Sequence, residues 1–511
     1  QGGPSLLRPG PAGRAVILTV LAFAQAMGTA SGLAHLLRVY WSLLLGNVVE
    51  WYEYAIFGYL EPYLEEHFFR GSAIATWLGF AVTFMARPLG GMLLGVVGDM
   101  YGRSVAVNLS IVGMLVGTCG QGLLPTYASG SDALGLVGII LLILLRILQG
   151  ISAAGEISTI STYITEVGSH RILGRSISLI AITVNIGFLF AKGVIFLLRS
   201  CLGEEAMRSW GWRAPFIVAL LPGLVAVWGR RWLPESEEFL EQKKAAAARA
   251  EDGAAAEDDQ EEEPGEAVAG RPSIREVVTS HGHNVLIGMG GVASAAIVQY
   301  GGFVWMQSYL LKKGLSPAGR MLAGLCARGL MIALALPVGW LTDIKGVGWV
   351  TLVGACLLAI GGLPLFAVLA AYPTNLTVVI LTLGVGFALL GSIGGTVFFY
   401  FVAELFPTAV RGAAVGISYN IGFSLFGGLA PIIAEASLAI SPIGPGVLMS
   451  AGGLITACSV GAGLCLERRG LVQLAHVRRR PYFSARRDSR GKDEDSSSSS
   501  SSTESSDEDC E

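Results

Sequence analysis

Two glutamates stand in the middle of an apolar stretch that is long enough to cross a membrane. Glu50 and Glu53 lie within residues 39–64, and about 20 residues suffice for a helix to span a bilayer. A carboxylate near the bilayer centre costs roughly 2.5 to 3.5 kcal/mol, so such a group usually faces an aqueous cavity or a partner. Because three residues turn a helix through about 300°, the two acids lie within about 60° of each other. The pair is typical of a site that handles protons or cations.

Other polar side chains interrupt the apolar spans that follow. Arg87 precedes Pro88 in the second span, and Gln149 and Glu156 in the fourth lie about 20° apart on a helix. We assign proton coupling to four residues, namely Glu50, Glu53, Arg87 and Glu156. The candidate substrate contacts are hydrogen-bonding or cationic side chains within apolar spans, namely Tyr52, Gln149, Asn185, Lys192, Gln299, Tyr300, Tyr419 and Asn420.

Each of these assignments has a plainer structural alternative. Glu50 and Glu53 could form a buried polar contact that locks helix packing. Arg87 could neutralise one of these acids or act in gating. Lys192 is either the counter-ion of an anionic substrate or a long basic side chain that snorkels toward a helix end.

Composition places the chain among polytopic membrane proteins. Hydrophobic residues make up 52% of its 511 residues and charged residues only 14%, whereas a soluble protein carries about 25% charged residues. Its seven cysteines are scattered, without the paired spacing of a disulfide framework or a zinc site. The sequence shows no nucleophile and base constellation, metal-ligand cluster or phosphate-binding loop. We therefore expect neither an enzyme nor a cofactor, and no nucleic-acid partner.

The apolar spans and the charged stretches divide the chain into five regions. We expect an N-terminal extension or targeting segment at 1–37, a six-helix bundle at 38–233, an acidic cytoplasmic linker at 234–283, a second six-helix bundle at 284–467 and a disordered Ser-rich acidic tail at 468–511. The linker is rich in Glu, Asp, Lys and Ala without apolar periodicity, which is typical of a solvated segment. Basic residues in the short loops favour placing both ends of the helical body in the cytoplasm.

A pattern of charges repeats between the two bundles. Asp99 in a Gly-rich turn is followed by Glu166 at a helix end, as Asp343 is followed by Glu404. Because six is an even number, the bundles share one orientation and form parallel repeats about an axis along the membrane normal. Charges at these helix ends either gate the path between the bundles or are ordinary solvated loop residues. The gate candidates are Asp99, Arg103, Glu166, Asp343, Glu404 and Arg411.

Longer motifs occur in a fixed order along the body of the chain. They read GNVVEWYEYAIFGY, FMARPLGGMLLGVVGDMYGR, RILQGISAAGE, GWRAPF, LPESEEF and AELFPTAVRGAAVGISYNIGFSLFGGLAP. With this set the chain resembles the major facilitator superfamily, and within it the metabolite:proton symporter family, which includes bacterial osmolyte, dicarboxylate, citrate and shikimate carriers. The resemblance implies an all-α membrane protein with twelve transmembrane helices in two six-helix parallel repeats. Two departures are Glu53, where the family has Asp, and TDIKGVG, which lacks a second basic residue.

The resemblance also implies a function. We expect a secondary active transporter that carries a small polar or anionic metabolite, such as an organic acid, amino acid or osmolyte, together with protons by alternating access. An uncoupled facilitator or exporter and a transporter-like nutrient receptor are the alternatives. The expected partners are the metabolite, protons and the lipid bilayer, and the expected state is a monomer. We expect a multi-pass protein of the plasma membrane, or of an organelle envelope if the N-terminus is a transit segment.

Overall fold

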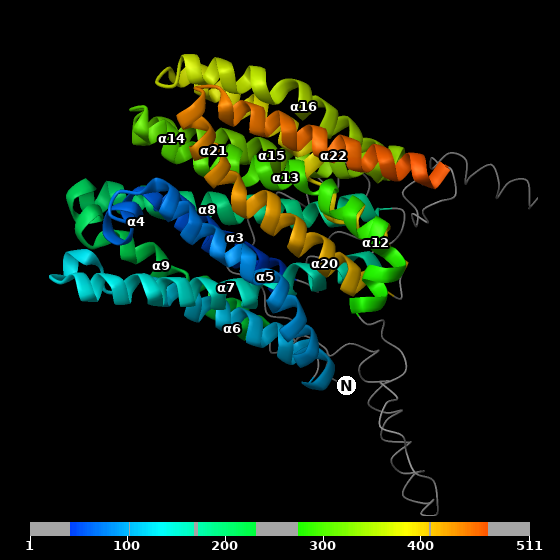
Figure 1. The fold of residues 1–511 in the computed structure, drawn as a ribbon, viewed down its shortest axis with the longest axis horizontal. Coiled ribbons are helices and arrows are strands. Elements are labelled where there is room, and N and C mark those ends of the chain that lie inside the picture. The colour runs from blue at the N-terminus through cyan, green and yellow to red at the C-terminus, as the bar shows by residue number, and fades with distance from the viewer. Residues whose placement is uncertain (1–40, 102, 168–171, 231–273, 408–409, 469–511) are drawn as a thin grey trace, which may run out of the picture.

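The described part of the chain is built from helices alone. The computed structural model describes residues 41–101, 103–167, 172–230, 274–407 and 410–468, and every regular element in them is a helix (Figure 1). The predicted N-terminal extension, the tail and most of the predicted linker lie outside these residues. The expected all-α class is confirmed.

The first bundle begins with two consecutive helices in place of one continuous span. Its backbone breaks at Leu60, and Pro62 then stands in the first turn of the next helix, where a proline costs no hydrogen bond. Another departure from helical geometry lies at Gly203, whose φ is 82°. The helices are α3 Trp41–Tyr59, α4 Glu61–Phe68, α5 Ala73–Tyr101, α6 Arg103–Gln121, α7 Asp132–Val167, α8 Leu173–Ser209, α9 Ala214–Val218 and α10 Leu220–Arg230.

The second bundle contains π-helical segments within three of its membrane crossings. Such widened turns occur often at functional sites, and here they are η3 Val298–Trp305, η4 Ile380–Phe387 and η5 Ser424–Gly428. The first helix of this bundle begins at Ile274, inside the range predicted as the linker. The α-helices are α12 Ile274–Gly291, α13 Ala293–Ile297, α14 Met306–Lys312, α15 Pro317–Lys345, α16 Val347–Ala371, α17 Leu376–Val379, α18 Ala388–Gly395, α19 Phe398–Glu404, α20 Arg411–Phe423, α21 Leu429–Ile440 and α22 Gly444–Arg468.

Local sequence explains where the long helix α15 begins and ends. The side chain of Ser316 accepts a hydrogen bond from the Gly319 backbone N–H, and Pro317 occupies the first turn, which is a favoured helix start. Gly346 follows the last residue with a φ of 89°, a conformation that glycine adopts without steric cost.

Helix length and composition identify most of the membrane crossings. Within the described residues, ten helices are long and apolar enough to cross a membrane, and Val105–Gln121 is a shorter apolar helix. The remaining crossing is α3, which the two glutamates make less apolar than the others. Large apolar side chains remain exposed on these helices, as expected for surfaces that face lipid. The predicted number of twelve helices is confirmed.

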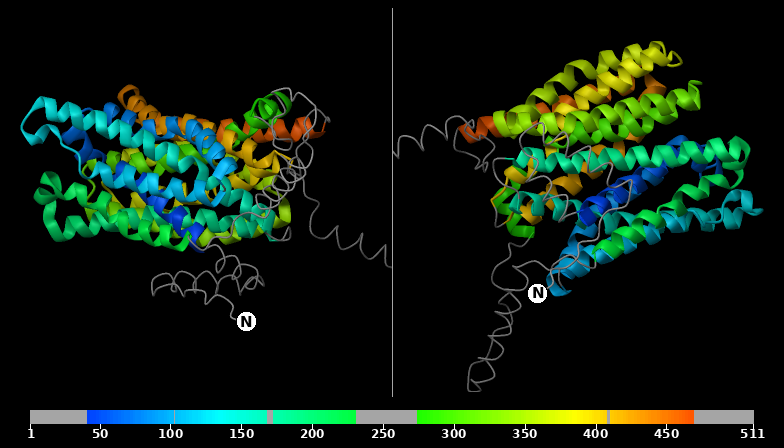
Figure 2. Two further views of the ribbon diagram at one scale, coloured as in Figure 1. Left: turned by 90° about the horizontal axis from the view of Figure 1, so that it is seen from below. Right: turned by 180° about the vertical axis from the view of Figure 1, so that it is seen from behind.

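The two bundles contact each other through several pairs of helices. In Figure 1, α15, α16 and α22 gather on one side and α6, α7 and α9 on the other. Between the bundles, α8 packs against α15, α5 packs against α20 and α21, and α3 packs against η3. Figure 2 shows from behind that α8 and α15 run alongside each other. Polar residues on these helices can therefore meet from both bundles.

Candidate functional site

Glu50 and Arg87 form a buried ion pair where the two bundles meet. Nη2 of Arg87 donates to Oε1 of Glu50 at 2.6 Å, and neither side chain is exposed. The Arg87 guanidinium also reaches the second bundle, because its Nη1 donates to the Tyr419 hydroxyl at 3.4 Å. A buried charge pair is stable only with close geometry and further hydrogen bonds. This contact supports the interpretation in which Arg87 neutralises an acid.

Glu53 belongs to a different network, which lies within the first bundle. Its Oε2 accepts a hydrogen bond from the Gln149 amide at 3.3 Å, and Oε1 of Gln149 accepts one from Arg146 at 2.9 Å. Arg146 also donates to the backbone carbonyls of Gly79 and Phe80. Glu53 and Gln149, predicted separately as a proton-coupling residue and a substrate contact, therefore lie in one network. Arg146 was not predicted, although an arginine in an apolar span meets the criterion that selected Arg87.

A second polar cluster joins α8 to the second bundle. Nζ of Lys192 donates to Oε1 of Gln307 at 2.7 Å. Nη1 of Arg328 donates to Oδ1 of Asn185 at 3.0 Å and to Oε1 of Gln299 at 2.9 Å. The structure therefore brings together three predicted residues, Asn185, Lys192 and Gln299. Arg328, the shared partner of Asn185 and Gln299, was missed, although it is an isolated arginine within the apolar helix α15.

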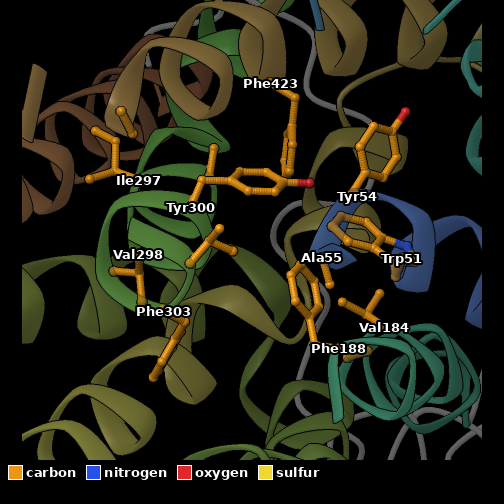
Figure 3. Close-up of a cluster of buried hydrophobic side chains, with 14 of the residues drawn as sticks. Trp51, Tyr54, Ala55, Val184, Phe188, Ile297, Val298, Tyr300, Phe303 and Phe423 are labelled. Atoms are coloured by element: carbon orange, nitrogen blue, oxygen red, sulfur yellow. The ribbon is translucent and has the colours of Figure 1, made fainter. Parts of the chain in front are cut away.

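Aromatic rings from both bundles fill the space between these polar groups. The Tyr300 ring lies 4.8 Å from that of Phe84 and 6.3 Å from those of Trp51, Phe188 and Phe423, measured between ring centroids. Figure 3 shows Tyr300 pointing from η3 toward Trp51 and Tyr54 of α3. The bundles thus contact each other through an apolar centre flanked by buried charges.

Asp343 bridges the bundles at one end of α15. Its Oδ1 accepts from the Gly174 backbone N–H at 2.6 Å, and its Oδ2 accepts from Nε of Arg175 at 2.8 Å. The helices approach closely here, because a Cβ added to Gly339 would lie 2.6 Å from the Gly174 carbonyl oxygen. We call this region the Asp343 end. Asp343 is a predicted gate residue, whereas its partner Arg175 was not predicted.

The other gate candidates have different surroundings. Nε of Arg411 donates to the Phe406 carbonyl at 3.4 Å, within the second bundle. Glu404 is buried at the end of α19. Four predicted side chains lie outside the described ones, namely Asp99, Arg103, Glu156 and Glu166.

Two further predicted substrate contacts donate hydrogen bonds to backbone carbonyls. The Tyr52 hydroxyl donates to the Pro215 carbonyl at 2.8 Å, which ties α3 to α9 within the first bundle. The Asn420 amide donates to the Ala154 carbonyl at 3.4 Å, which joins the bundles. Nearby, the Ser424 hydroxyl donates to the Phe84 carbonyl. The structure does not bring Tyr52 together with the other substrate candidates.

A cluster around Lys312 joins the bundles at the end opposite Asp343. Nζ of Lys312 lies 3.8 Å from Glu61, 3.7 Å from Glu65 and 3.2 Å from Glu435. The Trp305 indole N–H donates to Glu435 at 2.6 Å. Glu61 opens α4, beyond the break that ends the crossing helix α3, and burial raises the pKa of its carboxyl to about 7. We call this region the Lys312 end, and the bundles are therefore in contact at both ends.

Comparisons with known proteins agree with this architecture. The family model described as sugar (and other) transporter matches residues 33–460. The ectoine/proline transporter ProP of Corynebacterium glutamicum is 32% identical over 409 residues, covering 77% of this chain and 76% of that protein. The glycine betaine/proline/ectoine/pipecolic acid transporter OusA of Dickeya dadantii is 30% identical, with 76% and 75% covered.

Among solved structures, the proton:xylose symporter XylE bound to 6-bromo-6-deoxy-D-glucose superposes with a TM-score of 0.63. The match covers 86% of this chain and 97% of that one at 16% identity, and it shows a shared fold. The fold, the buried polar groups between the bundles and the matching family model lead to one conclusion: this chain belongs to the sugar (and other) transporter family of the major facilitator superfamily.

Proposed function

We propose that the protein carries a small osmolyte of the amino-acid or betaine type across a membrane together with protons. The observation that carries this proposal is Glu53, a carboxylate that is 2% exposed within a crossing helix and hydrogen-bonded to an amide. The substrate class is supported by relatives whose names state transport of proline, ectoine and glycine betaine. A carboxylate at membrane depth is costly and usually functional.

Glu53 is a better proton carrier than Glu50 for a physical reason. Glu50 is held at 2.6 Å by Arg87, so its protonation would leave a buried guanidinium without its counter-charge, which is strongly unfavourable. Glu53 accepts a hydrogen bond from the neutral Gln149 amide, a bond that the carbonyl oxygen of a protonated carboxyl can still accept. We therefore assign the transported proton to Glu53 and a fixed ion pair to Glu50.

Contacts between the bundles at both ends suit alternating access. Opening requires the Asp343 contacts or the Lys312 contacts to break, and each set of contacts stabilises closure at its own end. A protonated Glu53 brings no charge of its own into the closed centre, which lowers the cost of burying that carboxyl in the closed state. Binding of substrate and proton would then favour the same closed conformation, which couples their movement.

The test uses purified full-length protein in proteoliposomes with radiolabelled proline or glycine betaine. With an imposed proton gradient, the unmodified protein should accumulate substrate above the equilibrium level. Glu53→Gln keeps size and hydrogen bonding but removes titration, so gradient-driven accumulation should be lost while exchange without a gradient survives. Equilibration without accumulation by the unmodified protein would identify an uncoupled facilitator.

Glu50→Gln provides the matched comparison. It leaves Arg87 without its carboxylate, so accumulation, exchange and thermal stability should all fall together. If Glu53→Gln still concentrates substrate with the normal pH dependence, Glu53 does not carry the proton.

A further inference from the structure

We propose that Arg328 binds a carboxylate group of the substrate, with Lys192 as the second cation of the same subsite. This inference rests on the proposed transport of a small metabolite and adds the chemical group by which that metabolite is held. The ligand class is a compact molecule with one carboxylate, and in particular a zwitterion whose cationic end lies toward the neighbouring aromatic rings.

The Arg328 side chain leaves one edge of its guanidinium for a ligand. The guanidinium carbon lies over two aromatic rings, 4.1 Å from the ring centroid of Phe188 and 4.7 Å from that of Phe303. Figure 3 shows these rings, which come from α8 and from η3. Nη1 bonds two amide oxygens and the Tyr59 hydroxyl lies beside the guanidinium, whereas Nη2 makes no further hydrogen bond in the described part of the chain. An unpaired guanidinium nitrogen of this kind can donate to a carboxylate.

The charges around Arg328 favour an anionic ligand. The guanidinium is 2% exposed, and the groups that act on its charge are the phenols of Tyr59 and Tyr300. The charged groups that act on Lys192 are two cations, Arg320 and Arg328. By contrast, Arg87 lies against a carboxylate. A buried and a partly buried cation held side by side by neutral amides are costly, and a bound carboxylate would relieve that cost.

A purely structural role explains this arrangement less well. Asn185 and Gln299 could be joined across the bundles by an amide or a hydroxyl, which loses much less hydration on burial than a guanidinium does. Gln299, which accepts a hydrogen bond from Arg328, also has an amide nitrogen without a hydrogen-bond partner among the described residues. This donor would bind an additional acceptor atom of the ligand.

The position of this subsite links ligand binding to closure. Asn185 and Lys192 belong to α8 of the first bundle, and Gln299 and Arg328 belong to the second. A carboxylate on Arg328 would contact groups from both bundles only when they are together. The subsite would therefore stabilise the closed conformation more than either open one, which is the requirement for a transported ligand.

The test measures binding directly, by ligand-dependent thermal stabilisation of the purified full-length protein. Two pairs of compounds isolate the carboxylate: glycine betaine against choline, and proline against prolinol, in which a hydroxyl group replaces it. The unmodified protein should bind the carboxylate member of each pair about 10- to 100-fold more tightly, as expected for charge-assisted hydrogen bonds. Equal binding of both members, or binding of neither carboxylate, would overturn the proposal.

Substitutions then assign the effect to Arg328. In Arg328→Gln, the half-saturating concentration of glycine betaine should rise about tenfold or more, with choline unchanged. Arg328→Lys keeps the charge without the planar fork and should retain part of the discrimination; it decides the question if the glutamine variant does not fold. The matched control is Arg230→Gln, because Arg230 is equally buried but donates to the Val107 carbonyl within the first bundle.

Arg230→Gln should lower stability and leave the preference for carboxylates intact. If Arg328→Gln or Arg328→Lys discriminates as well as the unmodified protein, Arg328 does not bind the carboxylate. If proton-driven uptake fails while the protein still prefers the carboxylate compounds, the proposed proton coupling is rejected and the Arg328 subsite is retained.

Discussion

Two tyrosines predicted as substrate contacts form different kinds of hydrogen bond. The Tyr52 hydroxyl bonds a backbone carbonyl of the same bundle. The Tyr419 hydroxyl accepts a hydrogen bond from Arg87 of the opposite bundle. The first bond persists in any arrangement of the bundles, whereas the second exists only while they are in contact.

Removing each hydroxyl should therefore affect different properties. Tyr52→Phe leaves the buried Pro215 carbonyl without its donor, so the free energy of unfolding should fall by about 1 kcal/mol with transport per folded molecule unchanged. Tyr419→Phe should change the transport rate a few-fold, with little effect on thermal stability. Thermal unfolding and initial uptake rates distinguish the two variants, and equal effects on both properties would contradict this assignment.

The chemistry of the site was predictable from the sequence, but its pairing was not. Glu50, Glu53 and Arg87 are conspicuous because charges are rare in apolar spans, and the same rule would have selected Arg146 and Arg328. Which base neutralises which acid depends on how helices far apart in the chain pack together. Arg87 and Arg146 stand on different helices, and only their packing decides that Arg87 reaches Glu50.

At the scale of helices, α8 and α15 meet through glycines at the Asp343 end. Added side-chain atoms at either Gly174 or Gly339 would collide with the backbone of the other helix. This close approach lets the Asp343 carboxylate reach the Gly174 backbone N–H and the Arg175 side chain. Small residues at the crossing are therefore a condition for closing this end.

Gly339→Val should hold the Asp343 end open. A cysteine placed at Ser178, in a background without the native cysteines, should react faster with a membrane-impermeant thiol reagent, and uptake should slow. Gly329→Val is the matched control, because it lies in the same helix with no atom of a neighbouring element within 4 Å of an added Cβ. Equal labelling of the two variants would show that the glycine contact does not limit closure.

Hydropathy predicted the number and order of the crossings, but not their interruptions. The break between α3 and α4 and the π-helical segments η3, η4 and η5 leave little trace in apolar periodicity. They place side chains such as Gln299 and Tyr300 by a local change of helical pitch, which depends on neighbouring helices. Sequence alone therefore found these two residues without locating their partners.

In the molecule as a whole, the two bundles are in contact at both ends in one structure. The Asp343 end is held by a carboxylate with backbone and arginine donors, and the Lys312 end by one lysine among three acids. At the Lys312 end, one acid is fully buried and has its pKa raised to about 7.

Glu61 should make closure of the Lys312 end depend on pH. Burial is the main cause of its raised pKa, which attraction from Lys312 and a contact with Ser308 only partly offset. If opening hydrates Glu61 and returns its pKa toward the ordinary 4.5, the closed form binds the proton more tightly. The stabilisation of the closed form by this proton is then complete below pH 4.5 and is lost as the pH rises through about 7. Acid therefore favours closure at this end.

Spin labels at positions 66 and 313, which are exposed on opposite bundles, measure this closure as a distance distribution. In the unmodified protein, the short-distance population should be larger at pH 5.5 than at pH 8. Glu61→Gln is neutral at every pH and should keep the short distance under both conditions. Glu65→Gln also removes an acid near Lys312 but leaves the fully buried one, so it should preserve the dependence on pH. The proposal fails if the distance distribution of the unmodified protein does not change with pH, or if that of Glu61→Gln still changes. Either result would show that Glu61 does not control closure of this end.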